Sequence, residues 1–218
     1  MQADFWLERW RQRQIGWHQP DFHPALEKYW PTLGIDPSVR VFVPLCGRSL
    51  DMIWLARRGH PVLGVELSPI AASEFFGHEA LSASPSVAGR FIRHAAGPYE
   101  ILQGDFFDLT PAMAGAIGAW YDRAALIALP PDLRVRYADR IAGMLAPGTC
   151  GLLITAEYAQ EKMAGPPFAV MEDEVRALFG TRFELELLER QDVTAGNPRF
   201  IERGLKRLHE AVFRLTRR

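Results

Sequence analysis

Cysteine is scarce in this sequence of 218 residues, which contains only Cys46 and Cys150. The two lie far apart and each among apolar residues, so neither a disulfide framework nor a cysteine-rich metal site is expected. Long uncharged apolar runs are also missing, and charged residues interrupt the aromatic N-terminus, which argues against a membrane span or a secretion signal. We therefore expect a cytoplasmic protein with no membrane partner.

Neither sign of charge is in excess. The formal net charge is -1, from 25 lysines and arginines against 26 acidic residues. The arginines are scattered among acids rather than gathered in a stripe, so no nucleic-acid partner is indicated. The length suits one sizeable core. We expect a single domain over residues 1–218, with an N-terminal cap segment at 1–30, that acts as a monomer on small molecules.

The glycine pattern of dinucleotide-binding enzymes, G-x-G-x-x-G, is absent, although the run 39–66 otherwise reads as half of a nucleotide-binding site. The apolar stretch around Val41 predicts a strand covered on both faces, which Pro44 ends. Gly47 removes a side chain at the sharpest part of the following turn, where a ligand can approach the backbone closely. Because the other glycines of this pattern are missing, the sequence disfavours a NAD-binding site.

An acid closes this run. Ser49 can cap a helix that ends near Gly59, and the chain then returns as a strand that ends in Glu66. Glu66 lies 19 positions beyond Gly47, close to the spacing of ~20 residues at which Rossmann-like folds place an acid on a ribose diol. The alternative is an ordinary strand-helix-strand unit in which Glu66 is a solvated strand end.

Strands and helices continue to alternate after Glu66. Segment 82–97 is expected to contain a loop over the sheet edge. The expected helices are 68–81, 131–145 and 175–179, and the expected strands are 99–102, 115–121, 151–155, 183–188 and 212–215, the last two pairing antiparallel. This rhythm predicts an α/β, Rossmann-like fold: a mostly parallel sheet of about seven strands with an antiparallel end and helices on both faces.

Four groups of residues lie at the carboxyl ends of expected strands, where open α/β sheets bind their ligands. They are Leu45 to Gly47, Glu66, Asp105 with Phe106, and Asp122 with Arg123. Aspartate also caps turns often, so turn chemistry is the alternative for Asp105.

Several motifs together resemble one family. PLCGRSLDM at 44–52, RGHPVLGVELS at 58–68, GDFFDL at 104–109, YDRAALIALP at 121–130 and GLLITAEY at 151–158 are similar to the thiopurine S-methyltransferases, most closely the bacterial members. The N-terminal tryptophans and the segment IGWHQ fit the same family. The resemblance is specific from Phe5 to about Phe168 and looser beyond.

This resemblance implies a class I methyltransferase that uses S-adenosylmethionine. The family's cofactor contacts fall on Trp10, Leu45, Glu66 and Arg123, and the pair Asp105-Phe106 matches a further contact. S-adenosylmethionine carries no phosphate, so the missing glycines favour it over a dinucleotide. Glu66 would bind the ribose diol, and Asp105 or a neighbouring amide would bind the adenine edge, with Phe106 beside the ring.

The implied reaction is direct in-line methyl transfer to the sulfur of a thiopurine or another aromatic or heterocyclic thiol. It needs no covalent enzyme intermediate and no strong base, so no catalytic residue is assigned. His18 and Arg123 are the nearest candidates for stabilising a thiolate, and a turn histidine is the alternative for His18. Arg123 can instead pair with the cofactor carboxylate. The acceptor pocket is expected to include residues from 158–171.

The aromatic N-terminal segment must pack on something. A helix covering one face of the sheet accounts for Trp6 and Leu7 especially. We also expect Trp10 to close over the cofactor. There it would exclude water and place the face of its ring against the positively charged sulfonium.

Three alternatives remain open. A related methyltransferase could act on a selenium or tellurium compound or another small thiol. A NAD-linked oxidoreductase could share the fold, although no hydride-transfer site is evident. A non-catalytic protein could retain the cofactor pocket without turnover.

Overall fold

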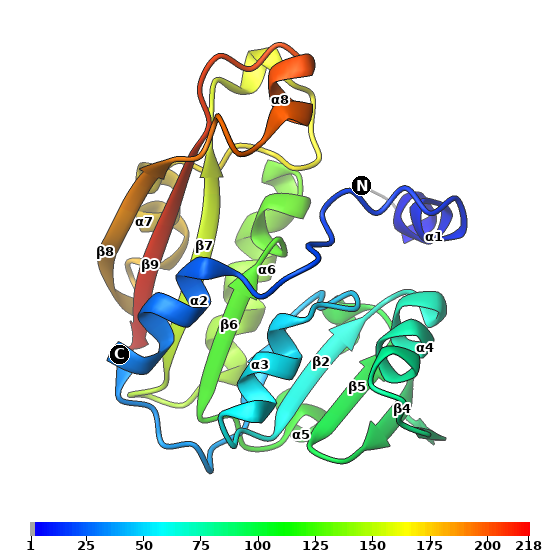
Figure 1. The fold of residues 1–218 in the computed structure, drawn as a ribbon. Coiled ribbons are helices and arrows are strands. Elements are labelled where there is room, and N and C mark those ends of the chain that lie inside the picture. The colour runs from blue at the N-terminus through cyan, green and yellow to red at the C-terminus, as the bar shows by residue number, and fades with distance from the viewer. Residues whose placement is uncertain (1–2) are drawn as a thin grey trace. The chain divides into compact units, whose positions relative to one another are not determined.

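The computed structural model describes residues 3–218 and contains nine strands in that range (Figure 1). The first two residues of the predicted cap segment lie outside the described part. The chain forms two compact units, the first ending at Tyr121 and the second running from Asp122 to Arg218. The predicted single domain stays a prediction, because two compact units can belong to one domain.

The first unit joins an N-terminal helical segment to an α/β core. Its elements are α1 (Ala3–Arg11), α2 (Pro24–Tyr29), η1 (Trp30–Leu33), β1 (Val41–Val43), α3 (Asp51–Arg57), β2 (Val62–Glu66), α4 (Pro69–His78), β3 (Ser84–Ala88), β4 (Phe91–Ala96), β5 (Tyr99–Gln103), η2 (Phe106–Asp108) and α5 (Pro111–Ala114), with β6 (Ala119–Arg123) crossing into the second unit. The strands follow the order β3-β4-β5-β2-β1-β6.

Four strands of this unit are parallel. β2 pairs with both β1 and β5, and β1 pairs with β6. β1 and β2 are buried along their whole length, as their continuous apolar runs predict. Because parallel strands end at the same edge, the residues that follow β1, β2 and β5 lie side by side. This edge carries the predicted cofactor residues of the first unit.

The predicted start of α4 is confirmed in this unit, whereas the predicted cap of α3 is one residue off. The Ser68 hydroxyl accepts a hydrogen bond from the Ala71 amide at 3.3 Å, and Pro69 is the first residue of α4. α4 ends at His78, three residues before the expected end. The Ser49 hydroxyl accepts from the Asp51 amide at 3.2 Å, although Leu50 holds the N-cap position of α3.

The expected loop over 82–97 is wrong, because β3 and β4 form an antiparallel hairpin there and β4 pairs with β5. β3 is almost entirely exposed, with Val87 85% exposed, so burial leaves no alternating pattern in its sequence. Phe91 is the one buried residue of β4 and packs against Gly104, where an added Cβ would lie 2.6 Å from its ring. Backbone pairing, not side-chain burial, makes β3 a strand.

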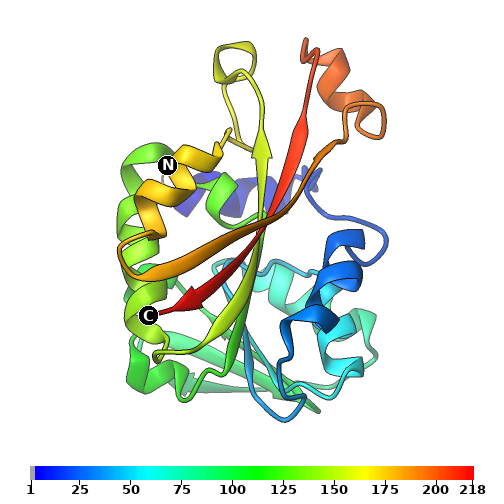
Figure 2. The same cartoon turned by 90° about the vertical axis from the view of Figure 1, so that its left-hand side faces the viewer.

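The second unit is built on antiparallel strands. Its elements are η3 (Leu126–Ala128), α6 (Pro131–Met144), β7 (Cys150–Glu157), η4 (Gln160–Lys162), α7 (Glu172–Phe179), β8 (Phe183–Asp192), α8 (Pro198–Glu202) and β9 (His209–Arg217). β9 lies between β7 and β8 and is antiparallel to both, which confirms the expected pairing of the late strands. Figure 2 shows α7 beside β8, and α7 also contacts α6.

No helix within residues 3–218 combines the length and the apolar character that crossing a bilayer requires. The longest, α6, has 14 residues, fewer than the roughly 20 that a span needs.

Gly64 lets β2 and the loop after β1 approach each other closely. A Cβ at this position would lie 2.6 Å from the Cys46 sulfur and 3.2 Å from the Met52 sulfur. Gly64 is in the middle of a fully buried strand, and both Cys46 and Met52 are buried, so an added methyl group overpacks this part of the core.

Gly64→Ala should therefore destabilise the protein, by about 1–3 kcal/mol, as overpacking of a core typically does. Gly77→Ala is the matched control, because Gly77 lies in α4 with nothing within 4 Å of an added Cβ. That control should stabilise α4 by roughly 0.5–1 kcal/mol. Urea unfolding of both variants measures the difference, and equal stability of Gly64→Ala and the unsubstituted protein would contradict the packing argument.

Candidate functional site

Glu66 ends β2 and is only 6% exposed. One carboxylate oxygen accepts a hydrogen bond from the Gly47 amide at 2.8 Å, and the other accepts from the Ser68 amide at 2.6 Å. Burial raises the pKa of Glu66 to about 7, and the amides that bind the carboxylate oppose this shift only in part. The groups that favour the ionised form are backbone amides, so a ligand that donates hydroxyl hydrogens would stabilise it further.

The loop after β1 carries two residues with left-handed backbone. Gly47 has φ of 54°, and Leu45, which has a side chain, has φ of 46°. A non-glycine residue held in this region is strained, and such strain concentrates at functional sites. The Cys46 amide between them donates to the Val65 carbonyl at 2.9 Å, which fixes the loop against β2. The strained turn thus lies directly beside Glu66.

Trp10 of α1 covers this turn. An added Cβ at Gly47 would lie 3.4 Å from the Trp10 indole, and Trp10 is 3% exposed. Its ring packs edge-to-face on Trp17 with centroids 5.9 Å apart. Trp6 and Leu7, expected to pack most closely, are only half-buried. Trp10 is the buried residue of α1, and it packs on the loop of residues 44–50 between β1 and α3, the candidate cofactor loop.

The end of β5 meets the end of β2. The Gly104 amide donates to the Glu66 carbonyl at 2.8 Å. Asp105 is exposed and accepts from the Phe107 amide at 2.8 Å, which is the turn role left open by its sequence. Phe106 is 1% exposed, and its ring stacks on Phe42 in the core. Phe106 can therefore meet a ligand only through its backbone, whereas the Asp105 side chain is accessible.

Arg123 is the last residue of β6 and is half-buried in the second unit. Burial lowers the pKa of Arg199 of α8, and the positive charges of Arg123 and Arg203 lower it further, which places the three guanidiniums near one another. Among the described residues, none of the three forms an ion pair with a carboxylate. The second unit thus holds three arginines whose positive charges act on one another.

Two other polar candidates are His18, which lies at a turn, and Cys46, which lies in the core. The His18 amide donates to the Ile15 carbonyl at 2.9 Å, so His18 lies in a turn. Cys46 is buried, and burial followed by the charge of Glu66 raises the pKa of its thiol, so it is not a reactive nucleophile.

The segment expected to line the acceptor pocket is held by its own hydrogen bonds. The Tyr158 hydroxyl donates to the Pro167 carbonyl at 2.6 Å. The Gln160 amide bridges the segment, donating to the Met163 carbonyl at 2.6 Å and accepting from the Ala169 amide at 2.8 Å. The loop after β7 is therefore a defined structure rather than a free connector.

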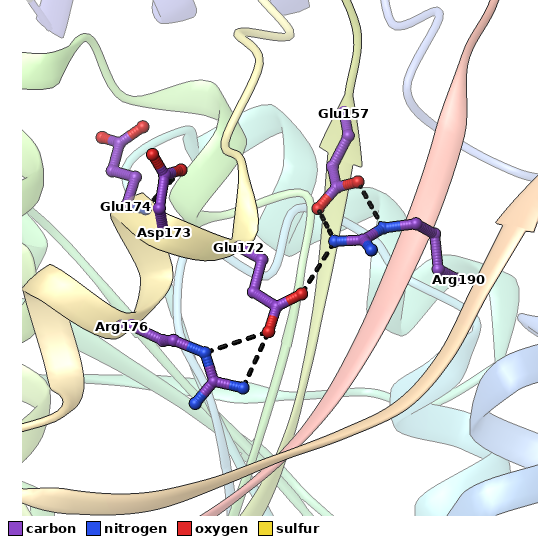
Figure 3. A network of polar contacts seen from close by, with 6 residues as sticks. All are labelled: Glu157, Glu172, Asp173, Glu174, Arg176 and Arg190. Carbon is purple, nitrogen blue, oxygen red and sulfur yellow. Dashed lines mark hydrogen bonds and ion pairs between the residues drawn. The ribbon is translucent and has the colours of Figure 1, made fainter.

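An ion-pair network fixes the residue from which this loop starts (Figure 3). Glu157, the buried last residue of β7, accepts from Arg190 of β8 at 2.8 and 3.1 Å. Arg190 also donates to Glu172 of α7 at 2.9 Å, and Glu172 accepts from Arg176 at 2.7 Å. Glu157 is thereby held by two elements of the same unit.

A family model described as thiopurine S-methyltransferase matches residues 1–218. The chain belongs to the thiopurine S-methyltransferase family. It is 50% identical to the thiopurine S-methyltransferase of Methylococcus capsulatus, over 98% of this chain and 96% of the relative. It is 48% identical to that of Nitrosospira multiformis, over 100% of this chain and 99% of the relative. The resemblance seen in the motifs is confirmed.

Solved structures confirm the predicted fold class. The 1,6-didemethyltoxoflavin-N1-methyltransferase of Burkholderia thailandensis, solved with S-adenosylhomocysteine, is similar with a TM-score of 0.66 at 17% identity, over 99% of this chain and 86% of that one. A SAM-dependent methyltransferase from Anabaena variabilis gives a TM-score of 0.66 at 13% identity, over 99% and 95%. The class I fold is thus shown, with nine strands rather than about seven.

S-adenosylmethionine, the cofactor of the thiopurine S-methyltransferase family, fits the residues of the first unit. The turn at Gly47 has a left-handed φ of 54°, which favours glycine, and the missing side chain suits close approach of a ligand to the backbone. Glu66 offers a buried carboxylate without a basic partner, which suits a pair of ribose hydroxyls. Among the described residues, we find no glycine-rich loop of the kind that binds a diphosphate. S-adenosylmethionine has no phosphate and does not need such a loop.

One supporting residue was not assigned from the sequence. Asp51 begins α3 and is buried, and its carboxylate accepts from the His23 amide at 2.8 Å and the Tyr121 hydroxyl at 2.9 Å. These bonds hold the start of α3, and so the end of the cofactor loop, against β6 and the N-terminal segment. The sequence did contain a signal for this role, because Asp51 is an acidic residue in an otherwise apolar face of the helix.

The affinity for S-adenosylmethionine should rise with pH between 6 and 8. The Glu66 carboxylate must be ionised to accept hydroxyl hydrogens, and its pKa of about 7 leaves most of it protonated at pH 6. Protonation at pH 6 should weaken binding by up to about tenfold, since one pH unit below a pKa leaves about a tenth of the group ionised.

Calorimetric titration at several pH values measures this dependence. Glu66→Gln should bind weakly at every pH and lose the slope. Asp108→Asn, a change at an acid paired with Arg90 at 2.9 Å, should keep the slope of the unsubstituted protein. The same slope in Glu66→Gln would assign the titration to another group.

Proposed function

We propose that this protein transfers a methyl group from S-adenosylmethionine to the sulfur of thiopurines and other aromatic or heterocyclic thiols. The observation that carries the proposal is 50% identity over 98% of the chain to a protein named thiopurine S-methyltransferase. Intact cofactor positions support it, since Trp10, Leu45, Glu66 and Arg123 all match the family pattern. These residues, with Gly47 and the pair Asp105-Phe106, are the proposed cofactor contacts.

Each contact has a role that its surroundings support. Glu66 accepts hydrogens from the ribose diol, and the backbone at Leu45 and Gly47 lies alongside the ligand. The accessible Asp105 carboxylate and the Phe106 backbone bind the adenine edge. Trp10 excludes water and presents a π face to positive charge. When bound, the cofactor supplies a sulfonium methyl group that an acceptor sulfur takes by direct in-line transfer, without a covalent enzyme intermediate.

Arg123 has two open roles, and the surrounding charge is relevant to both. Its neighbours Arg199 and Arg203 are cations, so this region of the second unit attracts an anion. An ionised thiol acceptor and the cofactor carboxylate are both anions that a guanidinium binds well. Arg123 is therefore proposed to bind one of them, and a binding measurement separates the two.

The proposed setting is the cytoplasm, with a small-molecule thiol as partner, no nucleic acid, no membrane and a monomeric state. The balanced charge of -1 supports the absence of a nucleic-acid partner.

Incubation with labelled S-adenosylmethionine should give methylated product with 6-mercaptopurine and thiophenol. A panel with selenite, tellurite and small aliphatic thiols ranks the alternative acceptors by kcat/KM. Faster turnover of a selenium or tellurium compound would make the thiopurine a tolerated substrate. Cofactor binding without any methylated product across the panel would favour a non-catalytic binding protein.

Arg123→Met should lower kcat/KM by roughly 10- to 100-fold, the effect of losing a charge-assisted hydrogen bond of about 1.5–3 kcal/mol. The Kd for S-adenosylmethionine, measured by calorimetry, rises by the same factor if Arg123 binds the cofactor and stays constant if it binds the acceptor. Arg207→Met, a change at an exposed arginine of the same unit, is the control and should leave both values unchanged. Unchanged activity of Arg123→Met would remove this residue from the site.

A further inference from the structure

Glu74 of α4 is a carboxylate shared by two arginines from different segments. One oxygen accepts a hydrogen bond from Arg13, which follows α1, and the other lies 3.1 Å from the guanidinium of Arg48. The Glu74 side chain is 17% exposed and Arg48 is 29% exposed, whereas Arg13 is 67% exposed, so solvent screens the contact of Arg13 in part. One side chain thus joins the N-terminal segment, the cofactor loop and α4.

The two arginines flank the contact that covers the cofactor loop. Arg13 lies three residues beyond Trp10, and Arg48 comes directly after Gly47, the residue on which Trp10 packs. Arg13 has left-handed backbone, with φ of 57°, and its amide donates to the Trp10 carbonyl at 3.2 Å. The chain therefore turns sharply after α1, and this turn places the Arg13 side chain on α4, which α1 also contacts (Figure 1).

Within the described residues, the side-chain contacts of Glu8 and Arg9 in α1 stay in the N-terminal segment. Glu8 pairs with Arg11 at 3.2 Å and with Gln12 at 2.7 Å, and Arg9 bonds to Gln14. These stabilise the helix but do not attach it to the core. The bond from Arg13 to Glu74 attaches the segment to a helix of the core, 61 positions away in the chain.

We propose that Glu74 is a positioning residue that holds α1, and with it Trp10, over the cofactor loop. This inference rests on the proposed function only for its consequence, which is slower release of S-adenosylmethionine. The guanidinium of Arg48 lies 3.1 Å from the other Glu74 oxygen and stays beside it when α1 is lifted, so α1 can dock again at the same place. The device controls access to the site and takes no part in the chemistry.

The test uses Glu74→Gln and Arg13→Gln, with Glu8→Gln and Arg11→Gln as matched controls. The controls remove the same charges from a pair internal to α1. Hydrogen exchange of the free protein over residues 3–17 should be faster in both test variants than in both controls. The Kd for S-adenosylmethionine should rise roughly two- to tenfold in the test variants, the range that a partly screened ion pair supports, with kcat unchanged.

Coupling and salt dependence sharpen the test. The double variant Arg13→Gln/Glu74→Gln should bind about as weakly as Glu74→Gln alone, because both changes break one contact. Added salt should weaken cofactor binding in the unsubstituted protein more than in Glu74→Gln. Arg13 is 67% exposed, so Arg13→Gln keeps the test valid if Glu74→Gln does not fold.

Equal exchange over residues 3–17 in test and control variants would overturn the positioning role. Additive losses in the double variant would also overturn it, since Arg13 and Glu74 would then act separately. Failure of the proposed function is a distinct result, namely no binding of S-adenosylmethionine by the unsubstituted protein. Exchange of the free protein does not depend on that binding.

Discussion

The buried carboxylate of Glu66 is the group on which the first unit is organised. It ends the central strand β2 and binds the amide of Gly47 from the loop after β1 and the amide of Ser68 from the start of α4. Its own carbonyl accepts from Gly104 at the end of β5. Burying a carboxylate costs free energy unless hydrogen bonds satisfy its oxygens. The segments that donate these bonds must therefore stay together for Glu66 to stay buried. The same bonds shape the loop that the cofactor is proposed to contact.

Most of the parallel core could be predicted because its signals are local. A continuous apolar run predicts β2, and Ser68 followed by Pro69 predicts the start of α4. The spacing from Gly47 to Glu66 is also local, and the structure joins the two by a hydrogen bond. The alternation of strands and helices predicts the α/β fold, and the family motifs then supplied the methyltransferase class and the activity, which strand and helix patterns alone do not give.

What the sequence left open depends on contacts between distant positions. β3 has no apolar alternation, so only its pairing with β4 reveals it. An aromatic residue such as Phe106 suits stacking on a ligand's ring and packing in a core equally well. Its stacking on Phe42 shows that its side chain is part of the core. Arg13 and Glu74 are ordinary surface residues in the sequence, and nothing local predicts that they meet. An ion pair between residues far apart in the chain leaves no pattern in a single sequence.

The division of the chain after Tyr121 has a consequence for biosynthesis. Trp10, the strained turn at Leu45, Glu66, Asp105 and every hydrogen-bonding partner of Glu66 described above lie within the first compact unit. The ribosome makes the chain from its N-terminus, so every group proposed to bind the ribose is translated before Arg199 of α8 and Arg203. The proposed ribose site is therefore synthesised early, and the positive charges proposed to attract an anion are completed last.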